Sequence, residues 1–274
     1  MIYDDTKCTL GEGPLWHPQR GELFWFDILG KRLHIKGRHW QFNRCVSAAG
    51  WIDDTQLLMA DSIGLHVFNL ENGTSDQVAE IDADNPITRS NDGRADPWGG
   101  FWIGTMGMNA EPGVAAIYRY YRGEVRTLFS NMQVTNAICF APDGSYAIFT
   151  DTRTKKIMRQ KLAEKDGWPV GDPELWIDFG DVDWKPDGAV IDAAGNFWNA
   201  QWGGNRVACY APDGTLVQTV AFPAHQTSCP AFGGPDLKTL FCTSAAIGLT
   251  GEDDGKTFTT PVEAVGQAEH QVIL

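Results

Sequence analysis

Four residues with oxygen-bearing side chains recur at nearly the same distance before a turn residue. The pairs, separated by 9, 8, 8 and 8 residues, are Glu12 and Gly21, Asn91 and Gly99, Asn136 and Gly144, and Asp187 and Gly195. Carboxylate and amide oxygens are the donors that hard divalent cations prefer, and no histidine shares this position, which argues against a structural zinc site. If the repeated spacing reflects repeated structure, these side chains converge on one cation.

Asn and Asp are also common in turns, and both Asn91-Asp92-Gly93 and Pro186-Asp187-Gly188 allow that simpler interpretation. Turn residues have no reason to share an offset from a second, separate turn, so the common register favours a cation site. Arg89 lies two residues before Asn91 and would share its face of a regular strand, which would place a positive charge beside the cation. The alternative for Arg89 is a solvated surface side chain.

The elements that must position these residues recur along the whole chain. A strand-like stretch, a turn rich in Pro, Asp and Gly and a second, often aromatic strand repeat, and the turn positions are Gly21, Thr55, Gly99, Gly144, Gly195 and Leu237. Successive gaps of 34, 44, 45, 51 and 42 residues are typical of propeller blades, whereas a β-sandwich explains neither the copies nor their spacing. We therefore expect an all-β fold, a six-bladed β-propeller, with residues 1–274 forming a single domain.

Composition and charge narrow the function classes. The 274 residues are 43% hydrophobic and carry 22 Lys and Arg against 35 Asp and Glu, a net charge of −13, which disfavours nucleic acid and anionic membranes as partners. No signal peptide and no apolar stretch long enough to span a bilayer is evident, so we expect a cytoplasmic protein. We also expect a monomer or a weak homo-oligomer. The 6 cysteines are scattered without metal-binding spacing, which predicts reduced, buried thiols.

Several motifs in order resemble the SMP-30/gluconolactonase family, which includes regucalcin and bacterial sugar lactonases. The motifs are Gly11-Glu12-Gly13-Pro14-Leu15-Trp16, Arg89-Ser90-Asn91-Asp92-Gly93, Gly104-Thr105-Met106, Asn136 ahead of Phe140-Ala141-Pro142-Asp143-Gly144, Pro186-Asp187-Gly188 and Phe232-Gly233-Gly234. The resemblance covers almost the full chain and implies a six-bladed propeller.

The resemblance also implies a site. One divalent ion, Ca²⁺, Zn²⁺, Mn²⁺, Mg²⁺ or Fe²⁺, would be held by Glu12, Asn136 and Asp187, and substrate would contact Arg89 and Asn91. Two features depart from the family pattern. Ala137 follows Asn136 where the family usually has glycine, and the family's substrate-binding glutamate corresponds only loosely to Glu111.

The expected reaction is hydrolysis of a sugar lactone, an aldonolactone, to its aldonic acid by metal-activated water, with Asp187 as the catalytic general base. No G-x-S-x-G motif marks a nucleophilic serine. Two alternatives stay open. The same fold could hydrolyse aryl esters or organophosphates, or it could be a calcium-binding regulatory protein without turnover.

Overall fold

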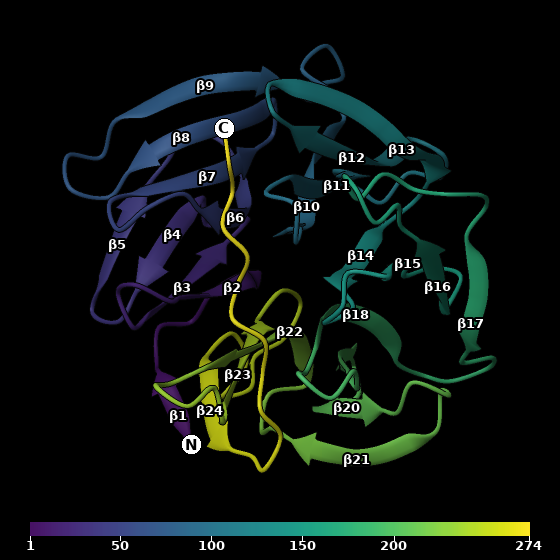
Figure 1. The fold of residues 1–274 in the computed structure, drawn as a ribbon. Helices are drawn as coiled ribbons and strands as arrows, with labels where there is room; N and C mark the ends of the chain where they lie inside the picture. The colour runs from purple at the N-terminus through teal and green to yellow at the C-terminus, as the bar shows by residue number, and fades with distance from the viewer.

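The computed structural model describes residues 1–274 and contains 24 strands and no helix (Figure 1). Four sheets have four strands each. The first contains β2 (Gly11–His17), β3 (Glu22–Asp27), β4 (Arg32–Ile35) and β5 (Arg38–Gln41). The second contains β6 (Val46–Trp51), β7 (Gln56–Asp61), β8 (Gly64–Asn69) and β9 (Ser75–Glu80).

The next two sheets follow the same order along the chain. The third contains β10 (Thr88–Ala95), β11 (Phe101–Gly107), β12 (Ala115–Tyr121) and β13 (Glu124–Met132). The fourth contains β14 (Thr135–Phe140), β15 (Tyr146–Asp151), β16 (Lys156–Lys161) and β17 (Glu174–Asp178). The remaining eight strands form one sheet, comprising β18 (Lys185–Ile191), β19 (Phe197–Trp202), β20 (Arg206–Tyr210), β21 (Leu216–Ala221), β22 (Gln226–Gly233), β23 (Thr239–Ala245), β24 (Thr257–Pro261) and β1 (Ile2–Asp4).

The prediction of six separate blades is therefore wrong, although the all-β class is confirmed. The structure has four separate four-stranded blades and one eight-stranded sheet. Trp202 at the end of β19 pairs with Gln226 at the start of β22, and this contact joins the last two groups of strands. The repeat in the sequence records how often a strand pattern recurs, but it does not determine whether neighbouring sheets hydrogen-bond to each other.

The first strand of each repeat lines a central axis. β2, β6, β10, β14, β18 and β22 contact one another in a closed ring, and the sheets radiate from it (Figure 1). Aromatic residues of the second strands pack against the neighbouring group of strands, and Trp25, Trp102 and Trp198 are completely buried. The outermost strands, such as β9 and β21, are mostly exposed. The innermost strands are thus the buried scaffold on which a site can be built.

Both ends of the chain help to close the ring. Ile2 in the N-terminal strand β1 pairs with Phe258 in β24, so the start of the chain completes the last group of strands. The C-terminal segment crosses the centre of the ring (Figure 1). Its last residues reach the second and third sheets, where the backbone N–H of Val272 donates to Trp51 O at 2.9 Å and that of Ile273 donates to Gly99 O at 2.9 Å.

All 6 cysteines are free and buried, which confirms the prediction of reduced thiols. Because the protein has no helices, it contains no helical segment that could cross a membrane.

Candidate active site

Four of the five predicted site residues lie at an irregularity of an innermost strand, and the fifth, Arg89, pairs in regular register with Met106 just before one. The antiparallel register shifts after Glu12 in β2, around Asn91 in β10, after Asn136 in β14 and around Asp187 in β18. A β-bulge adds a residue to one strand and re-aims its side chains, and bulges are common beside active sites. The similar offset between each of these residues and its turn residue therefore reflects a bulge at a similar distance from the hairpin turn in each repeat.

The bulge in β14 has a specific backbone requirement. Ala137 has φ = 59°, which lies in the left-handed region that favours glycine. An L-residue in this conformation costs roughly 1–2 kcal/mol. Ala137 is completely buried, so its methyl group offsets part of this cost by packing. The expected departure from glycine is thus accommodated, and Asn136 keeps its place in the bulge.

A chain of hydrogen bonds fixes the amide groups. Arg89 Nη1 donates to Asn91 Oδ1 at 2.8 Å, and Asn91 Nδ2 donates to Asn136 Oδ1 at 3.1 Å. Asn136 Nδ2 in turn donates to Thr152 Oγ1 at 2.9 Å, and Thr152 donates to Pro186 O at 2.9 Å. Since the Asn136 nitrogen is engaged on one side, its oxygen is directed toward Asn91, where a lone pair remains for a ligand.

The two predicted acids are buried close together. Burial raises the pKa of Glu12 to about 8, and the negative charge of Asp92 adds to the effect. Burial also raises the pKa of Asp187 well above its usual range, with further contributions from the charges of Glu12 and Asp92. Only the backbone N–H of Gly13 donates to the Glu12 side chain, at 3.1 Å, and no side chain donates to either carboxylate. The two carboxylates therefore repel each other, and the positive charge of Arg89 offsets this repulsion only in part.

All five predicted site residues line one cavity of about 310 Å³. They share it with the apolar residues Leu10, Leu29, Met106, Met108, Ala110, Val134, Trp202 and Ile247 and the polar residues Asn109, Thr152, Arg153 and Lys185. This volume suits a small ligand of sugar size. Trp202 supplies a large aromatic side chain to the wall, whereas Trp102 and Trp198 pack in the interior.

The donor set in this cavity fits a divalent cation. Glu12 and Asp187 supply carboxylates that a positive charge would relieve of their repulsion, and Asn136 supplies a directed amide oxygen. No group of three or more His, Cys, Asp or Glu side chains is assembled that could hold a metal ion by itself. The amide oxygen is thus a necessary part of any cation site here.

Several residues of the site were not found from the sequence. Asp92 is buried close enough to the two acids for its charge to raise the pKa of both, and burial raises its own pKa to about 6. It lies within the Asn91-Asp92-Gly93 motif, whose composition is typical of a turn, so nothing in the sequence separately marks Asp92 as part of the site. Arg153 and Lys185 also line the cavity. Lys185 directly precedes Pro186-Asp187, so its position next to a site residue was an available signal, whereas Arg153 has no such marker in its own repeat.

Glu111 and Ser228 take no part in the cavity lining. The Glu111 carboxylate accepts hydrogen bonds from the backbone and side-chain nitrogens of Asn109, both at 3.0 Å, and so folds onto its own loop. Ser228 is completely buried, and its hydroxyl donates to the backbone oxygen of Gly11. A serine bonded in this way has no histidine to activate it.

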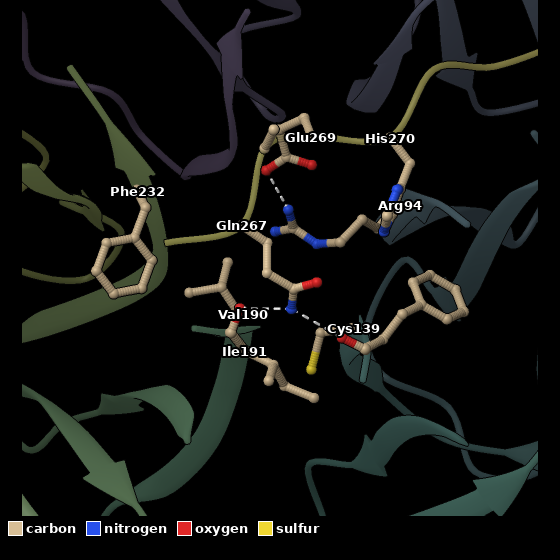
Figure 2. Close-up of a pocket in the computed structure, with 10 residues that line it drawn as sticks. Arg94, Cys139, Val190, Ile191, Phe232, Gln267, Glu269 and His270 are labelled. Atoms are coloured by element: carbon tan, nitrogen blue, oxygen red, sulfur yellow. Dashed lines mark hydrogen bonds and ion pairs between the residues drawn. The ribbon is translucent and has the colours of Figure 1, made fainter. Parts of the chain in front are cut away.

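A second, smaller cavity lies beneath the C-terminal segment. It measures about 30 Å³, enough for about one water molecule. Figure 2 shows Gln267 pointing inward, where its Nε2 donates to the backbone oxygens of Phe140 at 3.1 Å and Ile191 at 2.8 Å. Glu269 pairs with Arg94 beside it. This end of the ring is filled by the protein's own side chains and is too small for a sugar.

Comparison with known proteins identifies the family. The sequence profile of the SMP-30/Gluconolactonase/LRE-like region matches residues 10–246. The chain belongs to this family. The matched range includes all five predicted site residues, so the family assignment rests on the same part of the chain as the cavity.

Relatives in the SMP-30/gluconolactonase family align over nearly their whole length. L-arabinolactonase of Azospirillum brasilense is 34% identical, with 96% of this chain and 92% of the relative covered. A 6-deoxy-6-sulfogluconolactonase of Pseudomonas putida is 32% identical, with 97% and 98% covered. A protein of known crystal structure, described as a calcium-binding protein, regucalcin, from Agrobacterium tumefaciens, is 38% identical in sequence. Its structure matches with a TM-score of 0.97 over 100% of this chain and 97% of that chain.

Proposed function

We propose that this protein hydrolyses a sugar lactone to the aldonic acid and that a divalent metal ion is held by Glu12, Asn136 and Asp187. The observation that carries the proposal is the pair of buried, mutually repelling carboxylates beside a directed amide oxygen in a sugar-sized cavity. The family relatives named as lactonases support the reaction. The calcium-binding relative of known structure supports a divalent ion.

When bound, a divalent ion polarises a carbonyl oxygen and lowers the pKa of water. Oxygen donors alone do not choose among Ca²⁺, Zn²⁺, Mn²⁺, Mg²⁺ and Fe²⁺, because availability and site geometry decide occupancy as much as affinity does. Glu12 and Asn136 hold the ion in this proposal. Asp187 contributes to the same site and stands ready as a proton acceptor.

In the proposed reaction Asp187 accepts a proton from water and later returns it to the ring oxygen. The attacking water forms a bond to the lactone carbonyl carbon, and its proton passes to a carboxylate oxygen of Asp187. The ring carbon–oxygen bond then breaks, and the proton is returned to the departing ring oxygen, which gives the open-chain hydroxy acid. Asp187 can accept a proton only in its ionised form, which the positive charge of a bound ion would favour.

Arg89 and Asn91 orient the substrate in this scheme. Arg89 is buried, and its Nη1 is held by the backbone oxygen of Ser90 and by Asn91 Oδ1, both at 2.8 Å. Its remaining N–H groups can donate to the lactone carbonyl or a ring hydroxyl. Because the guanidinium is anchored on one edge, the substrate meets donors that are already in position.

Proton release from a panel of aldonolactones tests the proposal. The protein is treated with chelator, each divalent ion is restored in turn, and rates are compared with spontaneous hydrolysis. We expect loss of turnover on chelation, recovery with at least one ion and loss of turnover in Asp187→Ala. The control Asp143→Ala changes an exposed hairpin acid outside the cavity and should retain the parent rate. Parental turnover in Asp187→Ala would show that the assigned site is wrong.

The apolar rim favours a second candidate substrate class. Met108 and Ile247 line the cavity and are 48% and 43% exposed, so an aryl group could pack against the mouth. Adding p-nitrophenyl acetate and a phosphotriester to the panel separates this aryl-ester or organophosphate hydrolase from a lactonase. A protein that binds calcium tightly but turns over no substrate would instead be a regulatory member of the family.

A further inference from the structure

The candidate active site carries an excess of positive side chains on its substrate side. Arg89, Arg153 and Lys185 line the cavity, against the two acids Glu12 and Asp187. This balance is opposite in sign to that of the whole chain, which has a net charge of −13. A divalent ion on the two carboxylates would leave the three cations without a counter-charge among the side chains that line the cavity. The cavity is thus suited to a substrate that brings negative charge of its own.

A single hydrogen bond places two of these cations beside each other in the fold. Thr152 Oγ1 donates to Pro186 O at 2.9 Å, which ties the turn after β15 to the start of β18. Arg153 directly follows Thr152, and Lys185 directly precedes Pro186. The two cations are therefore brought to the same side of the cavity although 32 residues separate them in the sequence.

Arg153 is not neutralised by the acid nearest to it in the sequence. The oxygens of Asp151 accept hydrogen bonds from the backbone N–H groups of Gln133 at 2.9 Å, Val134 at 3.2 Å and Arg153 itself at 3.2 Å. These bonds hold the turn together and occupy the carboxylate. The Arg153 guanidinium forms no ion pair and is exposed at the cavity wall.

Lys185 is likewise without an acidic partner. Asp181 and Asp183 precede it in an exposed loop, but neither lies within ion-pair distance of it. The neighbouring lysines are engaged elsewhere, since Lys155 donates to the backbone oxygen of Val182 and Lys156 pairs with Asp178 at 3.8 Å. Lys185 thus differs from them in lining the cavity without an ion pair or a side-chain hydrogen bond to the protein.

We infer that the lactone hydrolysed at this site carries an anionic group, a phosphate, sulfonate or carboxylate, remote from its reacting carbonyl, and that Arg153 and Lys185 bind that group. This inference rests on the proposed function. Arg89 stays at the carbonyl end, because it is anchored to Asn91 beside Asn136. An arginine fork and a lysine ammonium together match the oxygens of such a group.

Steady-state kinetics with matched neutral and charged lactones test the inference. The substrates are glucono-1,5-lactone, which is neutral, 6-phosphoglucono-1,5-lactone and a glucarolactone that bears a free carboxylate. We expect kcat/KM to be at least tenfold higher for one of the two charged lactones than for the neutral one. The advantage should shrink as salt is raised, because these cations are near the solvent. Comparison of the two charged lactones distinguishes a phosphate-type group from a carboxylate.

Substitutions then assign the preference to the two cations. Arg153→Gln and Lys185→Gln should each lower kcat/KM for the preferred charged lactone by roughly tenfold, as expected for loss of one charge-assisted hydrogen bond. The loss for the neutral lactone should be clearly smaller, so that the double variant loses its discrimination. Lys165→Gln removes an exposed cation outside the cavity and should behave as the parent. Thermal unfolding of each variant verifies that the fold is intact.

A binding measurement separates failure of this inference from failure of the proposed function. Calorimetric titration with 6-phosphogluconate, which needs no turnover, should show binding that weakens in both cation variants. Turnover of the neutral lactone at an equal or higher kcat/KM would overturn the anion inference and keep the lactonase. Binding of 6-phosphogluconate that depends on both cations, with no lactone hydrolysed, would overturn the lactonase proposal and keep the anion site.

Discussion

The carboxylate of Asp92 accepts a hydrogen bond from the backbone N–H of Ile138 at 2.7 Å, and this bond connects the bulges of two neighbouring innermost strands. Ile138 lies two residues after Asn136, inside the irregular part of β14. A bulge leaves backbone groups without partners in the ladder, and Asp92 satisfies one of them. Asp92 therefore positions Asn136 from the adjacent strand, although it was not selected from the sequence.

Asp92→Ala should destabilise the protein by about 1–3 kcal/mol, because the buried N–H of Ile138 loses its acceptor. Asp92→Asn retains an acceptor oxygen and should be less destabilised. Urea unfolding of the two variants and the parent measures the difference. Equal stability of Asp92→Ala and the parent would show that the bond does not support the bulge.

Removal of the metal ion should lower the thermal midpoint. Binding at a hundred times Kd stabilises a protein by about 2.7 kcal/mol, which corresponds to roughly 5–10 °C for a chain of this size. In Asp187→Asn one of the two repelling carboxylates is removed, so the chelated variant should unfold at or above the midpoint of the chelated parent. Differential scanning fluorimetry with and without chelator, and with each ion restored, measures both effects. A parental response to metal in Asp187→Asn would remove Asp187 from the ligand set.

Glu269→Gln should destabilise the protein by about 3 kcal/mol. Glu269 pairs with Arg94 at the end of the ring opposite the candidate active site, where their side chains are only 9% and 12% exposed (Figure 2). Loss of one member of a buried pair leaves the other charge uncompensated. The exposed, unpaired Glu263 provides the matched control, and Glu263→Gln should change stability by less than about 0.5 kcal/mol. Chemical denaturation of both variants decides whether the pair holds the C-terminal segment.

His34 should make the protein less stable as the pH falls below neutrality. Burial lowers its pKa from 6.5 to about 4, and its ring stacks on Trp25 at 5.4 Å. Between these two pKa values the unfolded state binds more protons than the folded state, so the contribution of His34 to stability is lost as pH falls from about 6.5 toward 4. The parent should lose about 2 kcal/mol relative to His34→Phe between pH 7.5 and pH 4.5.

The comparison with His34→Phe is needed because Asp92 and Glu12 act in the opposite direction. Their pKa values are raised in the folded state, so their contribution to stability increases as the pH falls. Denaturant unfolding of the parent and the variant at both pH values isolates the contribution of His34. A difference between the two proteins that stays constant with pH would show that His34 does not titrate in this range.

The sequence by itself determined the strand-rich class and the register of the candidate site. Glu12, Asn91, Asn136 and Asp187 could be selected because local signals, a bulge and a hairpin turn at a fixed separation, repeat along the chain. These signals depend only on neighbours in the sequence. For this reason the offsets of 8 or 9 residues recur, although the residues around them differ from one repeat to the next.

Only the tertiary structure decided which strands join and which charges meet. The pairing of Trp202 with Gln226 merges two groups of strands, and no repeat in the sequence specifies a contact between repeats. Arg153 and Lys185 reach one cavity wall through a hydrogen bond between Thr152 and Pro186, a contact between residues 34 positions apart. Distances across the ring depend on how the sheets pack around the axis, and that packing is a property of the whole chain rather than of any one repeat.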